Sequence, residues 1–490
     1  MSDKLLTVDE ISKHSSADDC WIVVDGAVWD LSEFAPNHPG GAHIITRHAG
    51  RDASSTYNSI HDYSLLKTNL KPNDYKGKLD TRTVTEEWAK PPPTATPQLQ
   101  LNEKPPLSSV LNSHDFEEIA SRTISPKTWA FYSSASTDCL TRDLNTSFFS
   151  RISFRPRMLR NVSRISTSTT MLSHPISLPL YIAPAALAKL ISPLGEKALA
   201  TGAASPTPIP QIISTNASFP IATIRSASPS TPMFFQLYVN KDRAKTASLL
   251  AHVARLNIST VFLTVDAPVP GKREADERVK ADEGLSTPMS GQSAKNDAKG
   301  GGLGRIMGSY IDDSMTWDDL AWLRSVWKGK LVLKGVQGAA DARLALAAGV
   351  DGIVLSNHGG RSLDTSPPAV LVLVELQRVC PEVFEGMEVF VDSGIRRGTD
   401  LVKCLCLGAT AVGMGRSFLY ALNYGEEGVR HLIEIMRDEV ETTMKMLGVS
   451  RVEDLHPGLV STLDVDHLVN TTEGHPYAKK AAKKRVAAKL

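Results

Sequence analysis

A potential base and a fixed cation stand close together in residues 354–364, VLSNHGGRSLD, where an apolar run gives way to polar residues and two glycines. Histidine is the residue that most often serves as a general base, so His358 could remove a proton from a substrate. The guanidinium of Arg361 could hold a carboxylate through two parallel hydrogen bonds. This segment alone is equally compatible with a tight surface turn, so the rest of the chain must decide.

Polar residues also follow other apolar runs in the C-terminal part of the chain. Eight such runs lie at 178–184, 209–214, 233–239, 260–267, 331–336, 352–357, 388–394 and 411–416. Helical stretches such as 341–349 and 400–409 lie between most of them, which predicts parallel strands closed into a (β/α)8 barrel, an α/β fold. Barrel active sites lie at the carboxyl ends of the strands. The polar residues at these ends favour an active site over turn chemistry: Gln236, Tyr238, Thr264, Asp266, Lys334, Ser356, His358, Asp392, Gly415 and Arg416.

Two histidines near the N-terminus could bind a haem iron. His38 lies in His-Pro-Gly-Gly, and His61 follows it. Two imidazoles on opposite faces of a haem suit electron transfer, because the iron need not exchange a ligand. We therefore predict that His38 and His61 bind haem b, and we interpret His43 and His48 as surface histidines. Residues 3–80, including WIVVDGAVWDLSEF before His38, resemble the cytochrome b5 family, which implies a small α+β domain.

A proline-rich stretch separates this domain from the barrel. Residues 81–108 include TEEWAKPPPTATPQLQLNEKPPLSS, where the prolines favour extended backbone and the polar remainder cannot build a core. The segment SGQSAKNDAKGGGLGR at 290–305 is interpreted as a mobile excursion within the barrel domain, and we expect proteases to cut there first. We thus predict a haem-binding domain at 1–80, a hinge linker at 81–108, a barrel domain at 109–465 and a basic tail at 466–490.

Composition excludes several classes of protein. The 490 residues carry a formal net charge of +1, which gives no electrostatic reason to expect nucleic-acid binding. The five cysteines form no Cys-x-x-Cys pair, so neither a disulfide framework nor a zinc knuckle is supported. No apolar run approaches the roughly 20 residues that a membrane-spanning helix needs. We expect a protein of a reducing compartment, without a membrane span.

The motifs QLYV, LTVDAP, LKGV, SNHGGR, VDSGIRRG and GMGR occur in the order seen in FMN-dependent α-hydroxy acid dehydrogenases and oxidases. The resemblance runs from about Asp115 to Gly458. With the haem domain in front, the whole chain resembles the flavocytochrome b2 type. This resemblance implies FMN and haem b as cofactors. It also implies oxidation of a lactate-like L-2-hydroxy acid, electron transfer to the haem and then to an external one-electron acceptor such as a cytochrome c-like protein, and a homotetramer.

The same resemblance implies a role for each residue. His358 would be the base, Asp266 would stabilise the imidazolium, and Tyr238 would hydrogen-bond a substrate oxygen. Arg361 and Arg273 would hold the substrate carboxylate. Whether the base takes the Cα proton or the hydroxyl proton stays open. The FMN contacts would come from Pro184, Ala185, Ala186, Ser214, Gln236, Thr264, Lys334, Ser356, Asp392, Arg396, Gly415 and Arg416.

Several positions depart from the family pattern, among them Phe131, Ser393 and Asn216. Phe131 replaces the first tyrosine of Tyr-Tyr-Ser-Ser-Gly-Ala, whose hydroxyl helps to bind the substrate carboxylate. We expect weaker carboxylate binding, a different substrate or weaker coupling between flavin and haem. Ser393 replaces the first glycine of Asp-Gly-Gly-Val-Arg. Asn216 falls where the family often carries an apolar or aromatic residue near the substrate side chain, so lactate is a default substrate.

Other functions stay open at this point. An oxidase could use O2 directly with a regulatory haem domain, or a decayed barrel could carry a non-catalytic haem-binding protein. The C-terminal residues Ala488-Lys489-Leu490 resemble the Ser-Lys-Leu peroxisomal signal, and no mitochondrial presequence is evident. A solvated basic tail on a cytoplasmic protein explains them equally well. We therefore expect either the peroxisome or the cytoplasm.

Overall fold

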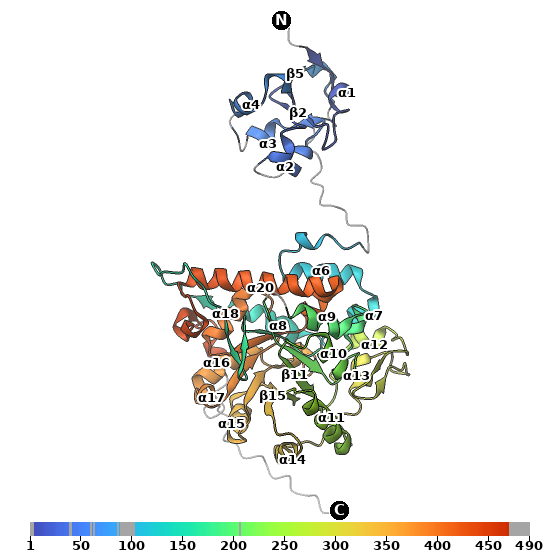
Figure 1. Ribbon diagram of the computed structural model, residues 1–490, viewed down its shortest axis with the longest axis vertical. Helices are drawn as coiled ribbons and strands as arrows, with labels where there is room; N and C mark the ends of the chain where they lie inside the picture. Colours follow the sequence, from blue (N-terminus) through green and yellow to red (C-terminus); the bar gives the residue numbers. More distant parts are fainter. Residues whose placement is uncertain are drawn as a thin grey trace, which may run out of the picture. The chain divides into compact units, whose positions relative to one another are not determined.

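The computed structural model describes residues 4–38, 42–58, 61, 64–85, 88, 103–204 and 207–469. The chain forms two compact units, Met1–Gln100 and Leu101–Leu490, which are drawn in blue and in cyan to red in Figure 1. Both units contain the secondary structure that their sequence patterns predict. The predicted domain limits stay a prediction.

The small unit is built on a mixed five-stranded sheet in the order β1-β5-β3-β2-β4. Its strands are β1 (Leu5–Leu6), β2 (Trp21–Val24), β3 (Ala27–Asp30), β4 (Arg51–Asp52) and β5 (Tyr75–Leu79). Asp25 and Gly26 join β2 to β3 with left-handed φ of 50° and 77°, as a tight hairpin requires. The short helices are α1 (Val8–Ile11), α2 (Ala42–Thr46), α3 (Ser54–Asn58) and α4 (Ser64–Asn69). The predicted small α+β domain is confirmed.

The large unit contains a closed barrel of eight parallel strands, as predicted. Its interior is filled by stacked apolar side chains, among them Tyr181, Phe234, Phe262 and Phe390. Because the interior is solid, a ligand can enter only at an end of the barrel. The strands are β9 (Leu180–Ile182), β10 (Gln211–Ser214), β11 (Met233–Leu237), β12 (Thr260–Thr264), β15 (Lys330–Val336), β16 (Gly352–Leu355), β17 (Glu388–Val391) and β18 (Ala411–Met414).

Helices surround this barrel and connect its strands. Figure 1 shows the long α20 (Gly425–Leu447) lying along one side, near α18 (Gly398–Cys406). The helices between strands include α9 (Gly195–Gly202), α10 (Ile221–Ala227), α11 (Arg243–Arg255), α14 (Asp319–Val326), α15 (Ala339–Ala347), α16 (Ala369–Val379) and α17 (Val383–Gly386), whereas α19 (Arg416–Ala421) follows the last barrel strand. Before the barrel come α6 (Ser113–Thr123), α7 (Pro126–Ser133) and α8 (Leu140–Ser150). No helix in the described part of the chain is long and apolar enough to cross a membrane.

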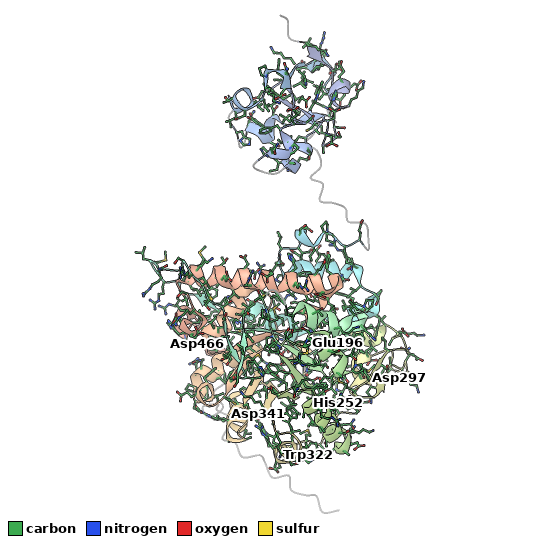
Figure 2. The ribbon with its side chains drawn as sticks, in the orientation of Figure 1. Glu196, His252, Asp297, Trp322, Asp341 and Asp466 are labelled. Atoms are coloured by element: carbon green, nitrogen blue, oxygen red, sulfur yellow. The ribbon has the colours of Figure 1, made fainter. Side chains whose placement is uncertain are left out.

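The excursion between β12 and β15 is more regular than its composition indicated. It contains α12 (Glu274–Arg278), the short hairpin β13 (Ser286–Thr287) and β14 (Gln292–Ser293), and α13 (Leu303–Met307). Arg305 bridges Glu277 and Asp297 at 2.8 and 2.7 Å, and Asp297 is labelled in Figure 2. The preference of proteases for 290–305 stays a prediction.

Both ends of the predicted linker contact the unit next to them. The indole Nε1 of Trp88 donates a 2.9 Å hydrogen bond to the carbonyl of Gly50 in the small unit. Lys104 donates to the carbonyl of Asn423, and the Tyr424 hydroxyl donates to the carbonyl of Pro105, in the large unit. Residues 89–102, which include the Pro-Pro-Pro run, lie outside the described part.

Candidate active site

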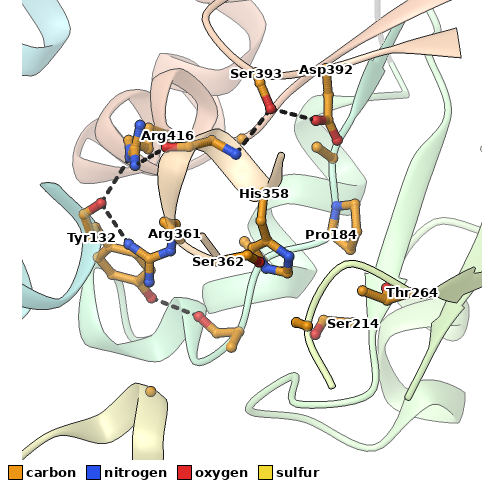
Figure 3. Close-up of a pocket in the computed structure, with 18 of the residues that line it drawn as sticks. Tyr132, Pro184, Ser214, Thr264, His358, Arg361, Ser362, Asp392, Ser393 and Arg416 are labelled. Carbon is orange, nitrogen blue, oxygen red and sulfur yellow. Dashed lines mark hydrogen bonds between the residues drawn. The ribbon is translucent and has the colours of Figure 1, made fainter. Parts of the chain in front are cut away.

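A cavity of about 220 Å³ opens at the carboxyl ends of the barrel strands. Figure 3 shows His358, Arg361, Arg416 and Asp392 converging on it. Of the residues predicted to bind flavin or substrate, all line the cavity except Asp266 and Ser356, which contact residues that do. The roles assigned to these residues stay predictions, but the structure brings the residues together.

The side chain of His358 is oriented by a buried carboxylate. Its Nδ1 lies 3.0 Å from Oδ1 of Asp266, whose side chain is fully buried. Burial opposes the ionisation of Asp266, but His358 and Lys334 lower the pKa of the carboxyl below its ordinary value. Because a carboxylate accepts, Nδ1 carries the proton and Nε2 is free to accept one. The Tyr238 hydroxyl lies 3.5 Å from Nε2, and burial raises its pKa, so it stays a hydrogen-bond donor.

The histidine lies in a backbone segment of unusual conformation. His358, Gly359 and Gly360 have φ of 61°, 66° and 78°, all in the left-handed region. A Cβ on Gly360 would lie 2.6 Å from the backbone nitrogen of Arg142. The left-handed φ of residues 359 and 360 favours glycine at both positions, and Gly360 also has no room for a side chain.

Three guanidinium groups face the cavity without a carboxylate partner among the described residues, that of the buried Arg273 and those of the half-buried Arg361 and Arg416. Arg361 donates to the carbonyls of Phe131 and Tyr132 at 2.8 and 3.0 Å. Arg416 donates to the carbonyls of Tyr132 and Gly359 at 3.0 and 2.8 Å. Burial lowers the pKa of all three, and in Arg361 the neighbouring arginines lower it further. Such a cluster favours bound anions, since an anion would offset the mutual repulsion.

Arg273 and Arg361 are arranged around the phenyl ring of Phe131. Their guanidinium carbons lie 5.4 and 5.3 Å from its centroid, within the range of a cation–π contact. The next residue, Tyr132, was not predicted as a site residue. Its carbonyl holds Arg361 and Arg416, and its hydroxyl donates to the carbonyls of Ala186 and Leu187. Its place in the altered Phe-Tyr-Ser-Ser motif was the only sequence signal.

A row of polar side chains crosses three neighbouring strands beside this cluster. Ser214 donates to Oε1 of Gln236 at 3.2 Å, and Nε2 of Gln236 donates to Thr264 at 3.0 Å. Lys334 lies on the next strand and pairs with Asp392 at 3.0 Å. Burial works against the Lys334 cation, but Asp392 and Asp266 raise its pKa, so the amine stays charged.

This arrangement fits FMN. The polar row can meet the hydrogen-bonding edge of an isoalloxazine, Lys334 can meet negative charge there, and Arg416 can meet a phosphate. Arg396 was predicted to contact the phosphate and lines the cavity, but its guanidinium contacts Glu117 and His114. Arg416 is therefore the cation more available to a phosphate.

In the small unit, His38 and His61 face each other. Their ring centroids lie 6.1 Å apart, with the ring planes at 84°. Two imidazoles on opposite sides of one metal ion, each at about 2 Å from it, place their centroids roughly 6 Å apart. The pair therefore fits haem iron. The expectation that His48 lies at the surface is wrong, because its ring is buried with 6% exposed. The side chain of His43 lies outside the described residues.

The fold and these two sites define a class of protein. A parallel barrel with a base, an anion-binding cluster and a flavin-sized polar cavity, combined with a bis-histidine unit, is a two-cofactor oxidoreductase. Residues 120–462 match the FMN-dependent dehydrogenase family, and residues 7–80 match the cytochrome b5-like heme/steroid binding domain. The chain belongs to the FMN-dependent dehydrogenase family and carries a cytochrome b5-like domain, so FMN and haem are its cofactors.

Several named proteins are similar to this chain. The L-lactate dehydrogenase (cytochrome) of Saccharomyces cerevisiae is 39% identical over 97% of this chain and 82% of its own length. A peroxisomal (S)-2-hydroxyacid oxidase of Arabidopsis thaliana is 39% identical over 73% of this chain and 98% of its own length. A mutant flavocytochrome b2 with pyruvate bound is a structural neighbour, with a TM-score of 0.67 and 41% identity over 74% of this chain and 89% of that one.

Proposed function

We propose that this protein is an FMN- and haem-dependent dehydrogenase that oxidises an L-2-hydroxy acid to the 2-oxo acid and passes the electrons to an external one-electron acceptor. The observation that carries the proposal is one cavity lined by His358, which Asp266 orients, and by three arginines without acidic partners among the described residues, in a chain with a bis-histidine unit. FMN supplies the two-electron oxidation, and haem supplies transfer of single electrons.

The protein's own residues bind and deprotonate the substrate. Arg361 and Arg273 hold the carboxylate, because both guanidinium groups face the cavity without an acidic partner among the described residues. The Tyr238 hydroxyl then donates to the substrate oxygen. Nε2 of His358 accepts the proton, and the Asp266 carboxylate stabilises the imidazolium that forms. The same placement serves removal of the Cα proton or of the hydroxyl proton.

The acceptor distinguishes two forms of this function. The haem unit favours a cytochrome c-like acceptor, in line with the name of the yeast relative, which is similar over both units. Similarity of the barrel unit to a peroxisomal oxidase favours O2 as a second candidate. The holoenzyme should reduce cytochrome c with L-lactate in air and release little hydrogen peroxide. Stoichiometric peroxide without cytochrome c reduction would instead identify an oxidase, and turnover of neither acceptor would reject both forms.

The substrate side chain is proposed to meet a polar wall. Asn216 lines the cavity, 5% exposed, and its Oδ1 accepts a 3.2 Å hydrogen bond from the Tyr310 hydroxyl. One amide N–H donates weakly to the Met307 carbonyl at 3.4 Å, which leaves the second N–H for a ligand. We expect a 2-hydroxy acid with a hydroxyl on its third carbon to compete well with lactate. The Asn216→Leu variant should favour lactate over this second acid. An unchanged ratio of the kcat/KM values for the two acids would refute the proposed preference.

Location and assembly are also proposals. We propose either a peroxisomal location, on the basis of Ala488-Lys489-Leu490, or a cytoplasmic one. Deleting these three residues from an N-terminal fluorescent fusion should disperse it, whereas equal dispersion of both fusions would leave a cytoplasmic protein. We propose a homotetramer from the family resemblance, and light scattering of the holoenzyme tests it, since a monomeric mass would contradict it.

A further inference from the structure

Ser393 adopts a backbone conformation that serine rarely takes. It follows β17 at the rim of the cavity, with a left-handed φ of 76° and 8% of its surface exposed. A side chain at such a φ crowds the backbone, whereas glycine does not. The chain has serine where glycine would remove the strain. Strain that persists beside a functional cavity indicates that the side chain has a task there.

The hydroxyl of Ser393 connects two strand ends. It donates a 2.9 Å hydrogen bond to Oδ1 of Asp392 and accepts a 2.9 Å hydrogen bond from the backbone N–H of Gly359. Figure 3 shows both contacts, with Ser393 between Asp392 and the segment that carries His358. The hydroxyl therefore joins the end of β17 to the residue directly after the base.

A second hydroxyl makes the equivalent contact one residue earlier. Ser356 accepts a 3.0 Å hydrogen bond from the backbone N–H of His358, and Nζ of Lys334 donates to the same hydroxyl at 3.1 Å. Lys334 also pairs with Oδ2 of Asp392 at 3.0 Å. The backbone N–H groups of His358 and Gly359 thus each donate to a serine hydroxyl. Each of these hydroxyls bonds in turn to one member of the buried Lys334–Asp392 ion pair.

These hydroxyls matter because the residues at the base form only a short 3₁₀ turn, His358–Gly360. His358, Gly359 and Gly360 are all left-handed, so the N–H groups of His358 and Gly359 cannot bond as they would in a helix or strand. Asp266 fixes only the imidazole. The two hydroxyls accept the N–H groups of His358 and Gly359, and Arg416 donates to the Gly359 carbonyl. The hydroxyls therefore contribute to the position of the His358 backbone.

We propose that Ser393 is a positioning residue for the base, which fixes the His358 segment relative to the Lys334–Asp392 pair at the flavin site. The inference rests on the proposed function for the role of His358. It explains why serine is kept at a strained position. It also predicts that replacing Ser393 by glycine changes stability and activity in opposite directions. Relief of the strain stabilises the fold, whereas loss of the hydroxyl slows the reaction.

The test compares Ser393→Gly and Ser393→Ala in the holoenzyme. Glycine removes both the strain and the hydroxyl, whereas alanine removes only the hydroxyl. We expect the Tm of Ser393→Gly to equal or exceed that of wild type, with full FMN occupancy. In both variants the rate of flavin reduction should fall about 10-fold, as for loss of one hydrogen bond to a carboxylate. The KM for the acid should change little, because Arg361 and Arg273 do not contact Ser393.

Asn257→Gly is the matched control. Asn257 also has a left-handed φ, 57°, but it follows α11 on the surface. Its replacement should leave the rate of flavin reduction unchanged. Wild-type rates in both Ser393 variants, or rates that fall only in proportion to lost FMN, would overturn the proposal.

Hydrogen exchange gives a readout that does not depend on turnover. In Ser393→Gly the amide of Gly359 loses its acceptor, so the peptide containing residues 358–360 should exchange faster than in wild type. Unchanged exchange would overturn the proposal. If no 2-hydroxy acid reduces the wild-type flavin, the proposed function fails, and faster exchange in the variant would still support the contact.

Discussion

The two units hold their histidines in opposite ways. His358 has one nitrogen fixed by Asp266 and the other free toward a cavity, in a strained segment supported by hydroxyls. His38 and His61 face each other, and no group of three or more metal-ligating residues occurs in the described part of the chain. A base must gain and lose a proton beside its substrate, whereas a haem ligand must stay in place. The difference shows that residue type alone does not define a role.

Replacing one histidine in each unit tests this contrast, and we expect the largest effects from these variants. His358→Gln should retain both cofactors but lose flavin reduction on the order of 10²-fold or more, because a general base is removed. His61→Ala should lose stable haem and keep flavin reduction, because the two units are separate compact bodies. Visible spectra and rapid mixing with L-lactate measure both. Loss of flavin reduction in His61→Ala would show that the units do not work independently.

Asp266→Asn should have a smaller effect, about 10-fold or more on kcat. The pKa of Asp266 is lowered in the fold, so the carboxylate is charged throughout the working pH range. Its contribution to stability is present above its unfolded value of about 3.8 and is lost as the pH falls further. The acid limb of kcat/KM should move to lower pH in the variant, since the imidazolium loses its counter-charge. An identical pH profile would remove Asp266 from the mechanism.

Phe131→Tyr should have the smallest effect and the opposite sign. The ring already contacts Arg273 and Arg361, so a hydroxyl can join them on the substrate carboxylate. We expect KM for the acid to fall about 5-fold, the size of one added hydrogen bond. Phe131→Leu is the control, which removes the ring and should raise KM. A higher KM in the tyrosine variant would show that the cavity is built around the missing hydroxyl.

Sequence predicted the barrel well because its strands are buried on both faces and therefore read as uninterrupted apolar runs. Residues at the ends of those strands, such as Lys334 and Asp392, could be placed in one site because parallel strands end at one face. Partners distant in sequence could not be predicted. Arg396 contacts Glu117 and His114, and His48 is buried, through tertiary packing that no local pattern records.

Backbone conformation was also beyond the sequence. Nothing in the motif around Ser393 shows a left-handed φ or a bond to Gly359. The left-handed φ of Gly359 and Gly360 could not be derived from the sequence either. Both cases depend on dihedral angles that are fixed only when neighbouring strands come together.

The central claim is that one chain couples oxidation of a 2-hydroxy acid at the barrel to the bis-histidine haem. Anaerobic rapid mixing of the holoenzyme with L-lactate tests it most directly, with visible absorbance as the readout. The account predicts loss of the oxidised-flavin absorbance, followed by the bands of reduced haem. An unchanged spectrum with L-lactate and other small L-2-hydroxy acids, while both cofactors are bound, would contradict it.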